Sequence, residues 1–210
     1  MHRTRVKICG LTRAEDALAC VRAGADAIGL VFVPKSPRCV SIEQAAAVIA
    51  VLPPFVACVA LFQNAGAEYV RAVMAHLSPT LLQFHGDEPR EFCSGFGRPY
   101  LRAVPMGAGA EVDDYARRFP DAAGLLLDSH GGERSGGSGE AFDWARIPAR
   151  RTLPLVLAGG LDPDNVAHAI YRVRPWAVDV SSGVEAAKGI KDARKIGAFM
   201  QAVRNGDDRG

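Results

Sequence analysis

The sequence predicts an α/β protein built as a single (β/α)8 TIM barrel, with a closed, parallel, eight-stranded sheet. Short runs rich in β-branched residues and Leu, bounded by Gly and Pro, recur eight times along the 210 residues. Most of these runs are apolar throughout, which is typical of parallel strands covered on both faces. Segments with helical apolar spacing lie between them. About 25 residues per strand–helix unit fit a barrel of nearly minimal size.

The predicted strands follow directly from these apolar runs. They span Arg5–Leu11, Asp26–Val33, Phe55–Phe62, Thr80–His85, Tyr100–Pro105, Gly124–Asp128, Pro154–Ala158 and Ala177–Ser181. An open, doubly wound sheet is the alternative architecture, but it usually needs fewer strands. Eight units therefore favour closure.

The predicted helices each show one apolar stripe at i, i+3, i+4, i+7 spacing. The stripes are Ala14/Ala17/Leu18/Val21, Val70/Val73/Met74/Leu77, Val112/Tyr115/Ala116/Phe119, Val166/Ala169/Ile170/Val173 and Ile196/Phe199/Met200/Val203. A shorter sixth helix is predicted near Asp143–Ile147, where Pro148 ends it.

Helix starts carry their own signals. Thr12-x-x-Glu15 and Ser41-x-x-Gln44 have the pattern of capping boxes, and Asp162-Pro163 has that of an N-cap followed by proline. We expect one barrel domain over residues 1–204 and a polar, frayed tail over 205–210.

Composition excludes several functional classes. A net charge of +2, from 25 basic and 23 acidic residues scattered along the chain, predicts no nucleic-acid partner. No apolar run is long enough to span a bilayer, and the N-terminus lacks the apolar stretch of a signal peptide. The five widely spaced cysteines form no CxxC pair and predict neither a disulfide framework nor a zinc site. A reducing cytoplasm is therefore the expected compartment.

Glycine-rich turns after the seventh and eighth strands predict a phosphate site. Leu157–Leu161 includes Gly159 and Gly160, and Asp179–Glu185 includes Ser181, Ser182 and Gly183. Barrels of this kind commonly hold phosphate with these two loops, where backbone amides can approach the anion closely. The alternative is that the glycines serve only tight turns. A third Gly/Ser segment, 131–139, is either a lid or a flexible surface loop.

Reactive side chains lie at the carboxyl ends of the first and sixth predicted strands and in the loop after the second. Lys7 and Cys9 are two residues apart and share a face of the first strand. Asp128 follows three leucines, where an unpaired carboxylate would be costly. Arg38 lies in a Pro-bounded loop. A thiol and a carboxyl group across one pocket suit an aldose–ketose rearrangement, although spacing alone leaves the direction of proton transfer open.

The other cysteines have simpler interpretations. We expect Cys20, Cys58 and Cys93 to be inert buried thiols, which is the usual role of a lone cysteine. Cys39 adjoins Arg38 and receives no assigned chemistry.

In their order along the chain, several motifs resemble the phosphoribosylanthranilate isomerase family of tryptophan biosynthesis. They are Lys7-Ile8-Cys9-Gly10-Leu11-Thr12, Gly29-Leu30-Val31-Phe32, Ser36-Pro37-Arg38, Leu82-Gln83-Phe84-His85-Gly86, Leu126-Leu127-Asp128, Gly136-Gly137-Ser138-Gly139, Phe142-Asp143-Trp144, Leu157-Ala158-Gly159-Gly160-Leu161 and Val178-Asp179-Val180-Ser181-Ser182-Gly183-Val184-Glu185. The resemblance covers almost the whole chain. Ala158 departs mildly from it, because Ser often precedes the double glycine in this family.

The resemblance implies an Amadori rearrangement of N-(5-phosphoribosyl)anthranilate to 1-(o-carboxyphenylamino)-1-deoxyribulose 5-phosphate. It implies that Asp128 is the general acid, that Cys9 is the general base, and that Arg38 binds the anthranilate carboxylate. The resemblance also assigns substrate binding to Lys7, Arg38, His85, Gly159, Gly160, Ser181, Ser182 and Gly183, and it implies no metal or organic cofactor. We expect Lys7 to favour the Cys9 thiolate and His85 to act only indirectly.

Three alternatives remain open at the sequence level. An indole-glycerol-phosphate synthase would need an additional N-terminal segment and catalytic Lys/Glu pairs, and a pentose-phosphate epimerase would need metal-binding His and Asp residues. A non-catalytic module would bind a phosphorylated ligand without turnover. For assembly, we expect a monomer, with a homodimer as the alternative.

Overall fold

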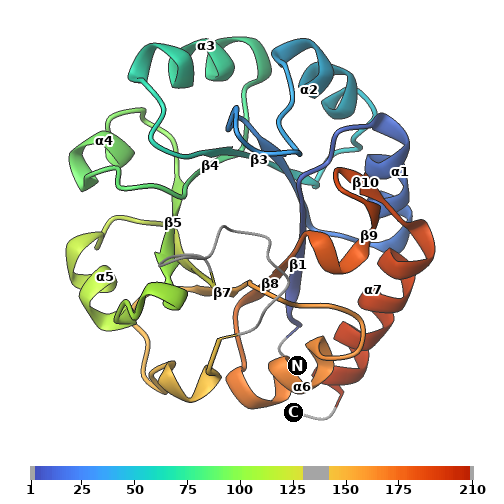
Figure 1. Cartoon of the computed structure of the whole chain (residues 1–210), viewed down its shortest axis with the longest axis vertical. Helices are drawn as coiled ribbons and strands as arrows, with labels where there is room; N and C mark the ends of the chain where they lie inside the picture. The colour runs from blue at the N-terminus through green and yellow to red at the C-terminus, as the bar shows by residue number, and fades with distance from the viewer. Residues whose placement is uncertain (1–2, 130–141, 209–210) are drawn as a thin grey trace.

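The computed structural model describes residues 3–129 and 142–208 of the chain. Eight parallel strands form a closed barrel in sequence order, and β8 pairs with β1 to complete the ring (Figure 1). The strands are β1 (Arg5–Cys9), β2 (Ala27–Val31), β3 (Ala57–Phe62), β4 (Leu81–Phe84), β5 (Tyr100–Pro105), β6 (Gly124–Asp128), β7 (Leu155–Leu157) and β8 (Ala177–Val180). The predicted barrel is confirmed, and the open sheet is excluded by the β1–β8 pairing.

The helices surround the barrel (Figure 1). They are α1 (Ala14–Ala23), α2 (Ile42–Ile49), α3 (Ala67–Leu77), α4 (Arg90–Ser94), α5 (Val112–Arg118), α6 (Val166–Val173) and α7 (Ala193–Asp207). Three 3-10 helices are η1 (Met106–Ala108), η2 (Trp144–Arg146) and η3 (Ser182–Val184), and β9 (Glu185–Ala187) pairs with β10 (Ile190–Lys191) in a small hairpin after η3.

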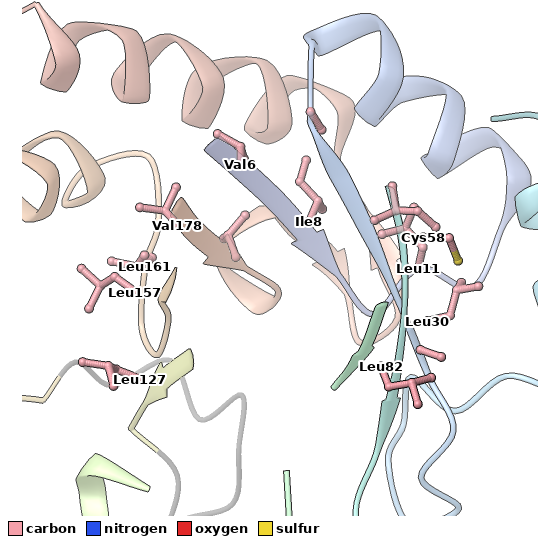
Figure 2. Packing of buried hydrophobic residues seen from close by; sticks show 14 of the residues in the cluster. Val6, Ile8, Leu11, Leu30, Cys58, Leu82, Leu127, Leu157, Leu161 and Val178 are labelled. Carbon is pink, nitrogen blue, oxygen red and sulfur yellow. The ribbon is translucent and has the colours of Figure 1, made fainter. Parts of the chain in front are cut away.

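Side-chain alternation along the strands separates two environments. On β1, Val6 and Ile8 belong to the large apolar cluster between the barrel and its helices, part of which Figure 2 shows. The alternate residues, Lys7 and Cys9, therefore point into the barrel. Cys9 packs there in a separate interior cluster with Val31 and Leu61.

The barrel interior is layered. A second interior cluster is entirely apolar and contains Leu101, Ala103, Leu126, Val156, Ala158 and Ala177. Asp128 and Asp179 are buried further along β6 and β8, towards the carboxyl ends of these strands, and Lys7 lies on β1 in register with Asp179. One end of the barrel interior is therefore filled with apolar side chains, and the other end carries ionisable side chains. In this architecture the active site lies at the carboxyl ends of the strands.

Of the two predicted capping boxes, one is confirmed. Ser41 Oγ accepts from the Gln44 backbone N–H, and the Gln44 side chain accepts from the Ser41 N–H. The Thr12 prediction is wrong, because α1 has Arg13 at its N-cap position without a side-chain cap. Thr12 Oγ1 instead donates to the Gly189 carbonyl at 2.6 Å.

Three further boundaries differ from the sequence predictions. The expected helix near Asp143 is the short η2, whose first turn Asp143 caps. Asp162 accepts from Asp164 and Asn165 backbone N–H groups, but α6 begins only at Val166. Helix α7 extends into the predicted tail of residues 205–210 and ends at Asp207. The Asp207 carboxylate accepts from the Thr4 N–H and hydroxyl.

Within the described ranges, no helix is long and apolar enough to cross a membrane. Two large apolar side chains lie at the surface near strand starts. Phe55 is fully exposed, with a backbone φ of 72°, and Trp176 is half-exposed, with the Arg5 guanidinium 3.7 Å from its ring centroid.

Candidate active site

A cavity of about 480 Å³ opens at the carboxyl ends of the strands. Most of the predicted site residues line it: Cys9, Arg38, His85, Asp128, Gly159, Gly160, Ser181 and Ser182. Lys7 and Gly183 are not among the residues that line it. The closure of the barrel thus brings together the ends of β1, β4, β6, β7 and β8.

The Cys9 thiol lies beside Gly29 of β2, which has no side chain to occupy this space. A Cβ atom on Gly29 would lie 2.7 Å from Cys9 Sγ and 3.1 Å from Lys7 Cε, so only glycine fits beside them. Burial raises the pKa of the Cys9 thiol, and the neighbouring Lys7 ammonium opposes that rise without cancelling it. The expectation that Lys7 favours the thiolate is therefore right in direction, but burial has the larger effect.

Lys7 is paired with a carboxylate on the adjacent strand β8, which sequence analysis did not assign. Lys7 Nζ donates to both carboxylate oxygens of Asp179, at 2.9 and 3.0 Å. Both side chains are at most 8% exposed. Burial alone would lower the pKa of Lys7, but the charges of Asp179 and Cys9 raise it above its usual range. Lys7 is therefore a fixed cation behind the Cys9 sulfur.

Asp128 lies at the end of β6 and contacts His85 on the loop after β4. His85 Nε2 is 3.0 Å from Asp128 Oδ2, and the Gln83 amide nitrogen is 3.0 Å from His85 Nδ1. Because an amide nitrogen can only donate, His85 Nδ1 accepts and its Nε2–H donates to Asp128. This bond stabilises the carboxylate that remains when Asp128 gives up a proton.

Arg38 is held by an acidic residue beyond β8. Its Nε and Nη2 donate to the two oxygens of the Glu185 carboxylate, at 2.7 and 2.9 Å. Lys191 Nζ donates to Oε1 of the same carboxylate at 2.9 Å and to the Ser181 carbonyl at 3.0 Å. Two cations therefore share one carboxylate at this side of the cavity.

The loops after β7 and β8 form the remaining wall. Gly159 and Gly160 have φ values of 77° and 68°, a backbone conformation that favours glycine. The Gly160 carbonyl accepts from the Asn165 side chain at 2.7 Å. Ser181 Oγ donates to the Cys9 carbonyl at 3.1 Å, which ties the loop after β8 to the end of β1. Gly183 leaves room for the Leu161 carbonyl, so the two loops pack directly together.

Sequence reasoning missed Asp179, Glu185 and Lys191 as site residues. Asp179 carried a usable signal, because it is a carboxylate in an apolar strand and shares a face with Ser181 two residues later. Glu185 and Lys191 carried no such signal, since only the folded hairpin brings them to Arg38.

Two other expectations concern what the site contains. In the part of the chain that the structure describes, no group of three or more His, Cys, Asp or Glu residues could hold a metal ion. The Gly/Ser segment that we interpreted as a lid or surface loop lies outside the described residues.

In a closed (β/α)8 barrel, a thiol and a carboxyl group beside glycine-bearing loops after β7 and β8 form a site suited to acid–base isomerisation of a phosphorylated sugar, which defines a class of barrel isomerases. The profile of one such family, described as N-(5'-phosphoribosyl)anthranilate (PRA) isomerase, matches residues 6–202. This chain belongs to that family, which confirms the resemblance seen in its motifs.

Relatives and solved structures agree with this assignment. N-(5'-phosphoribosyl)anthranilate isomerases from Pseudomonas fluorescens and Dechloromonas aromatica are both 55% identical, over 99% and 98% of this chain and 99% of each relative. The crystal structure of the Thermotoga maritima enzyme has a TM-score of 0.88 at 43% identity, covering 96% of this chain and 98% of that one. A phosphoribosyl anthranilate isomerase in complex with reduced 1-(o-carboxyphenylamino)-1-deoxyribulose 5-phosphate has a TM-score of 0.83 at 41% identity, with the same coverage.

Proposed function

We propose that this chain catalyses the Amadori rearrangement of N-(5-phosphoribosyl)anthranilate to 1-(o-carboxyphenylamino)-1-deoxyribulose 5-phosphate, a step of tryptophan biosynthesis. The observation that carries the proposal is that Cys9 and Asp128, 119 positions apart along the chain (128 − 9), line the same cavity. The family assignment supports the same reaction.

In the first step, Asp128 protonates the ribose ring oxygen. The bond between this oxygen and C1 breaks, and the nitrogen lone pair forms a C1=N Schiff base. The hydrogen bond from His85 supports this step, because it stabilises the carboxylate that Asp128 becomes.

In the second step, the Cys9 thiolate removes the proton from C2. The electron pair forms a C1=C2 double bond, and the C=N pair returns to nitrogen, giving an enolamine that tautomerises to the ketose. The buried Lys7 cation behind Cys9 supports the thiolate against the effect of burial.

The substrate's two anionic ends have separate sites in this proposal. Arg38 binds the anthranilate carboxylate through the part of its guanidinium not held by Glu185. Backbone amides of Gly160, Ser181 and Ser182 bind the phosphate, and the positive φ of Gly160 supports their convergence. Lys7 supports the site through its charge beside Cys9, and Gly183 lets the loops after β7 and β8 pack together.

The test is turnover by the purified full chain, followed as loss of substrate fluorescence, with the product identified by mass spectrometry. We expect saturable conversion to the ketose. Binding without conversion would instead make the chain a ligand-binding module, and activity only on the ketose or on pentose phosphates would favour the other barrel enzymes. The Arg38→Ala variant should raise KM markedly, and an unchanged KM would exclude the carboxylate contact.

For assembly and location, we propose a monomer in a reducing, cytoplasmic compartment. The free thiols of Cys9, Cys20, Cys39, Cys58 and Cys93 support the reducing compartment. A homodimer is the alternative, since a Thermotoga maritima relative is described as dimeric. Sedimentation at several protein concentrations distinguishes the two states.

A further inference from the structure

The Glu185 carboxylate fixes one edge of the Arg38 guanidinium. The two bonds of 2.7 and 2.9 Å form a bidentate pair, which restrains both the position and the plane of the guanidinium. Both side chains are largely buried, at 11% and 6% exposure. An arginine side chain has several rotatable bonds, and this pairing removes much of that freedom before any ligand arrives.

Lys191 connects the same carboxylate to the loop after β8. Its ammonium group donates to Glu185 Oε1 and to the Ser181 carbonyl, and its side chain is fully buried. Lys191 lies on β10 and Glu185 on β9, so one hairpin carries both residues. The hairpin turn is fixed as well, because the Gly189 N–H donates to Glu185 and its carbonyl accepts from Thr12.

With Arg38, Lys191 and Glu185 ionised, this cluster has an excess of one positive charge next to the cavity. Burial lowers the pKa of Lys191, and the Glu185 carboxylate opposes that effect. Burial favours the neutral form of Glu185, but hydrogen bonds from Arg38 and Lys191 hold its pKa below the usual range. The carboxylate is therefore ionised and lies between two cations. An anionic ligand at the free part of Arg38 would balance the remaining charge.

We propose that Glu185 is a positioning residue that sets the Arg38 guanidinium for the substrate carboxylate and, through Lys191, fixes its distance from the Ser181 loop that receives the phosphate. This inference rests on the proposed function and deepens it. The hairpin then acts as a spacer between the two anion sites. It favours substrates whose carboxylate and phosphate have the matching separation.

The experiment compares Glu185→Gln with the wild-type chain in the turnover assay. The amide keeps the shape of the side chain but cannot accept both guanidinium bonds as a charged group. We expect KM to rise on the order of tenfold, the scale of a lost charge-assisted hydrogen bond, with kcat changed less than threefold. A fall in kcat at unchanged KM, or a lowered KM, would overturn the proposal, the latter by showing that Glu185 competes with the substrate for Arg38.

A double-mutant cycle separates positioning from general destabilisation. In an Arg38→Ala background, Glu185→Gln should no longer raise KM, because the group that Glu185 orients is absent. Additive effects would overturn the proposal. Asp121→Asn is the control, since Asp121 accepts from Arg90 and from the Tyr100 hydroxyl, none of the three lines the cavity, and KM should stay unchanged. Should Glu185→Gln fail to fold, Glu185→Asp, which keeps the charge but shortens the reach, must show the same rise in KM.

Binding of two fragments of the substrate tests the role of Glu185 without relying on turnover. Binding of anthranilate and of inorganic phosphate is measured separately by calorimetry. Glu185→Gln should weaken anthranilate about tenfold and leave phosphate unchanged, whereas Lys191→Met should weaken both. An inactive wild-type chain would overturn the proposed function, while the fragment results would still support or overturn the role of Glu185.

Discussion

His85 Nε2 lies 3.0 Å from Asp128 Oδ2, a contact between the loop after β4 and the end of β6. The Gln83 amide fixes the ring from its other nitrogen, so the proton faces the carboxylate. The sequence predicts an indirect role for His85, and this geometry identifies Asp128 as the residue through which His85 acts. His85→Ala, which leaves no donor, should therefore lower kcat by about tenfold through the lost charge-assisted bond, with KM nearly unchanged. The double variant with Asp128→Ala should be no slower than Asp128→Ala alone, and additive losses would separate the two residues.

The acid–base pair should show the largest kinetic effects. We expect Cys9→Ala and Asp128→Ala each to lower kcat by about 10²–10⁴-fold, the usual range for a positioned proton carrier. KM should change much less, because both groups act mainly in the transition state. Steady-state kinetics with circular dichroism as a folding control are sufficient. Near-normal kcat in either variant would remove that residue from the mechanism.

The pH dependence of the reaction should depend on the Lys7 ammonium beside Cys9. A general base must lose its proton, so kcat/KM should rise as pH passes upward through the Cys9 pKa. Burial raises this pKa and Lys7 lowers it. Lys7→Met removes the lowering effect, so the rising limb should move to higher pH. A limb that stays in place or moves to lower pH would show that Cys9 ionisation does not control the rate.

The buried ion pair between Lys7 and Asp179 should also contribute to the stability of the fold. Lys7 and Asp179 are both buried, and removing one partner leaves the other charge uncompensated. Lys7→Met should reduce the free energy of unfolding by about 3–5 kcal/mol. The double variant Lys7→Met with Asp179→Asn should recover part of this loss, because no unpaired charge then remains buried. Urea denaturation measures both, and a double variant less stable than Lys7→Met would contradict the explanation.

Gly29 offers a steric test of the thiol position. In Gly29→Ala the new methyl group would lie within 2.7 Å of Cys9 Sγ, so the sulfur must move and kcat should fall at least tenfold. Gly197 on α7 is the matched control, because a Cβ there meets nothing within 4 Å. Gly197→Ala should leave kcat unchanged and raise stability by about 0.5–1 kcal/mol. Equal kinetic effects in the two variants would refute the steric argument.

Local patterns along the chain were sufficient to predict the strands, most of the helices and the family. Apolar runs at β1 to β8 and stripes at helical spacing are local properties, so the closed barrel was predictable from them. The predicted positions of Cys9, Asp128 and Arg38 on one cavity followed from the rule that barrel strands end at a common face. Local signals were weaker at boundaries, where tertiary contacts compete with them. Thr12 thus bonds to Gly189 instead of capping α1.

The pairing of the buried charges, in contrast, depends on the folded barrel. Lys7 meets Asp179, Arg38 meets Glu185, and His85 meets Asp128 across sequence separations of 172, 147 and 43 residues. Such contacts depend on barrel closure and on the path of the hairpin after β8, which no local pattern encodes. The free energy of a buried charge is set by its neighbours in space. The partners that tune this site therefore emerge only when the chain is folded.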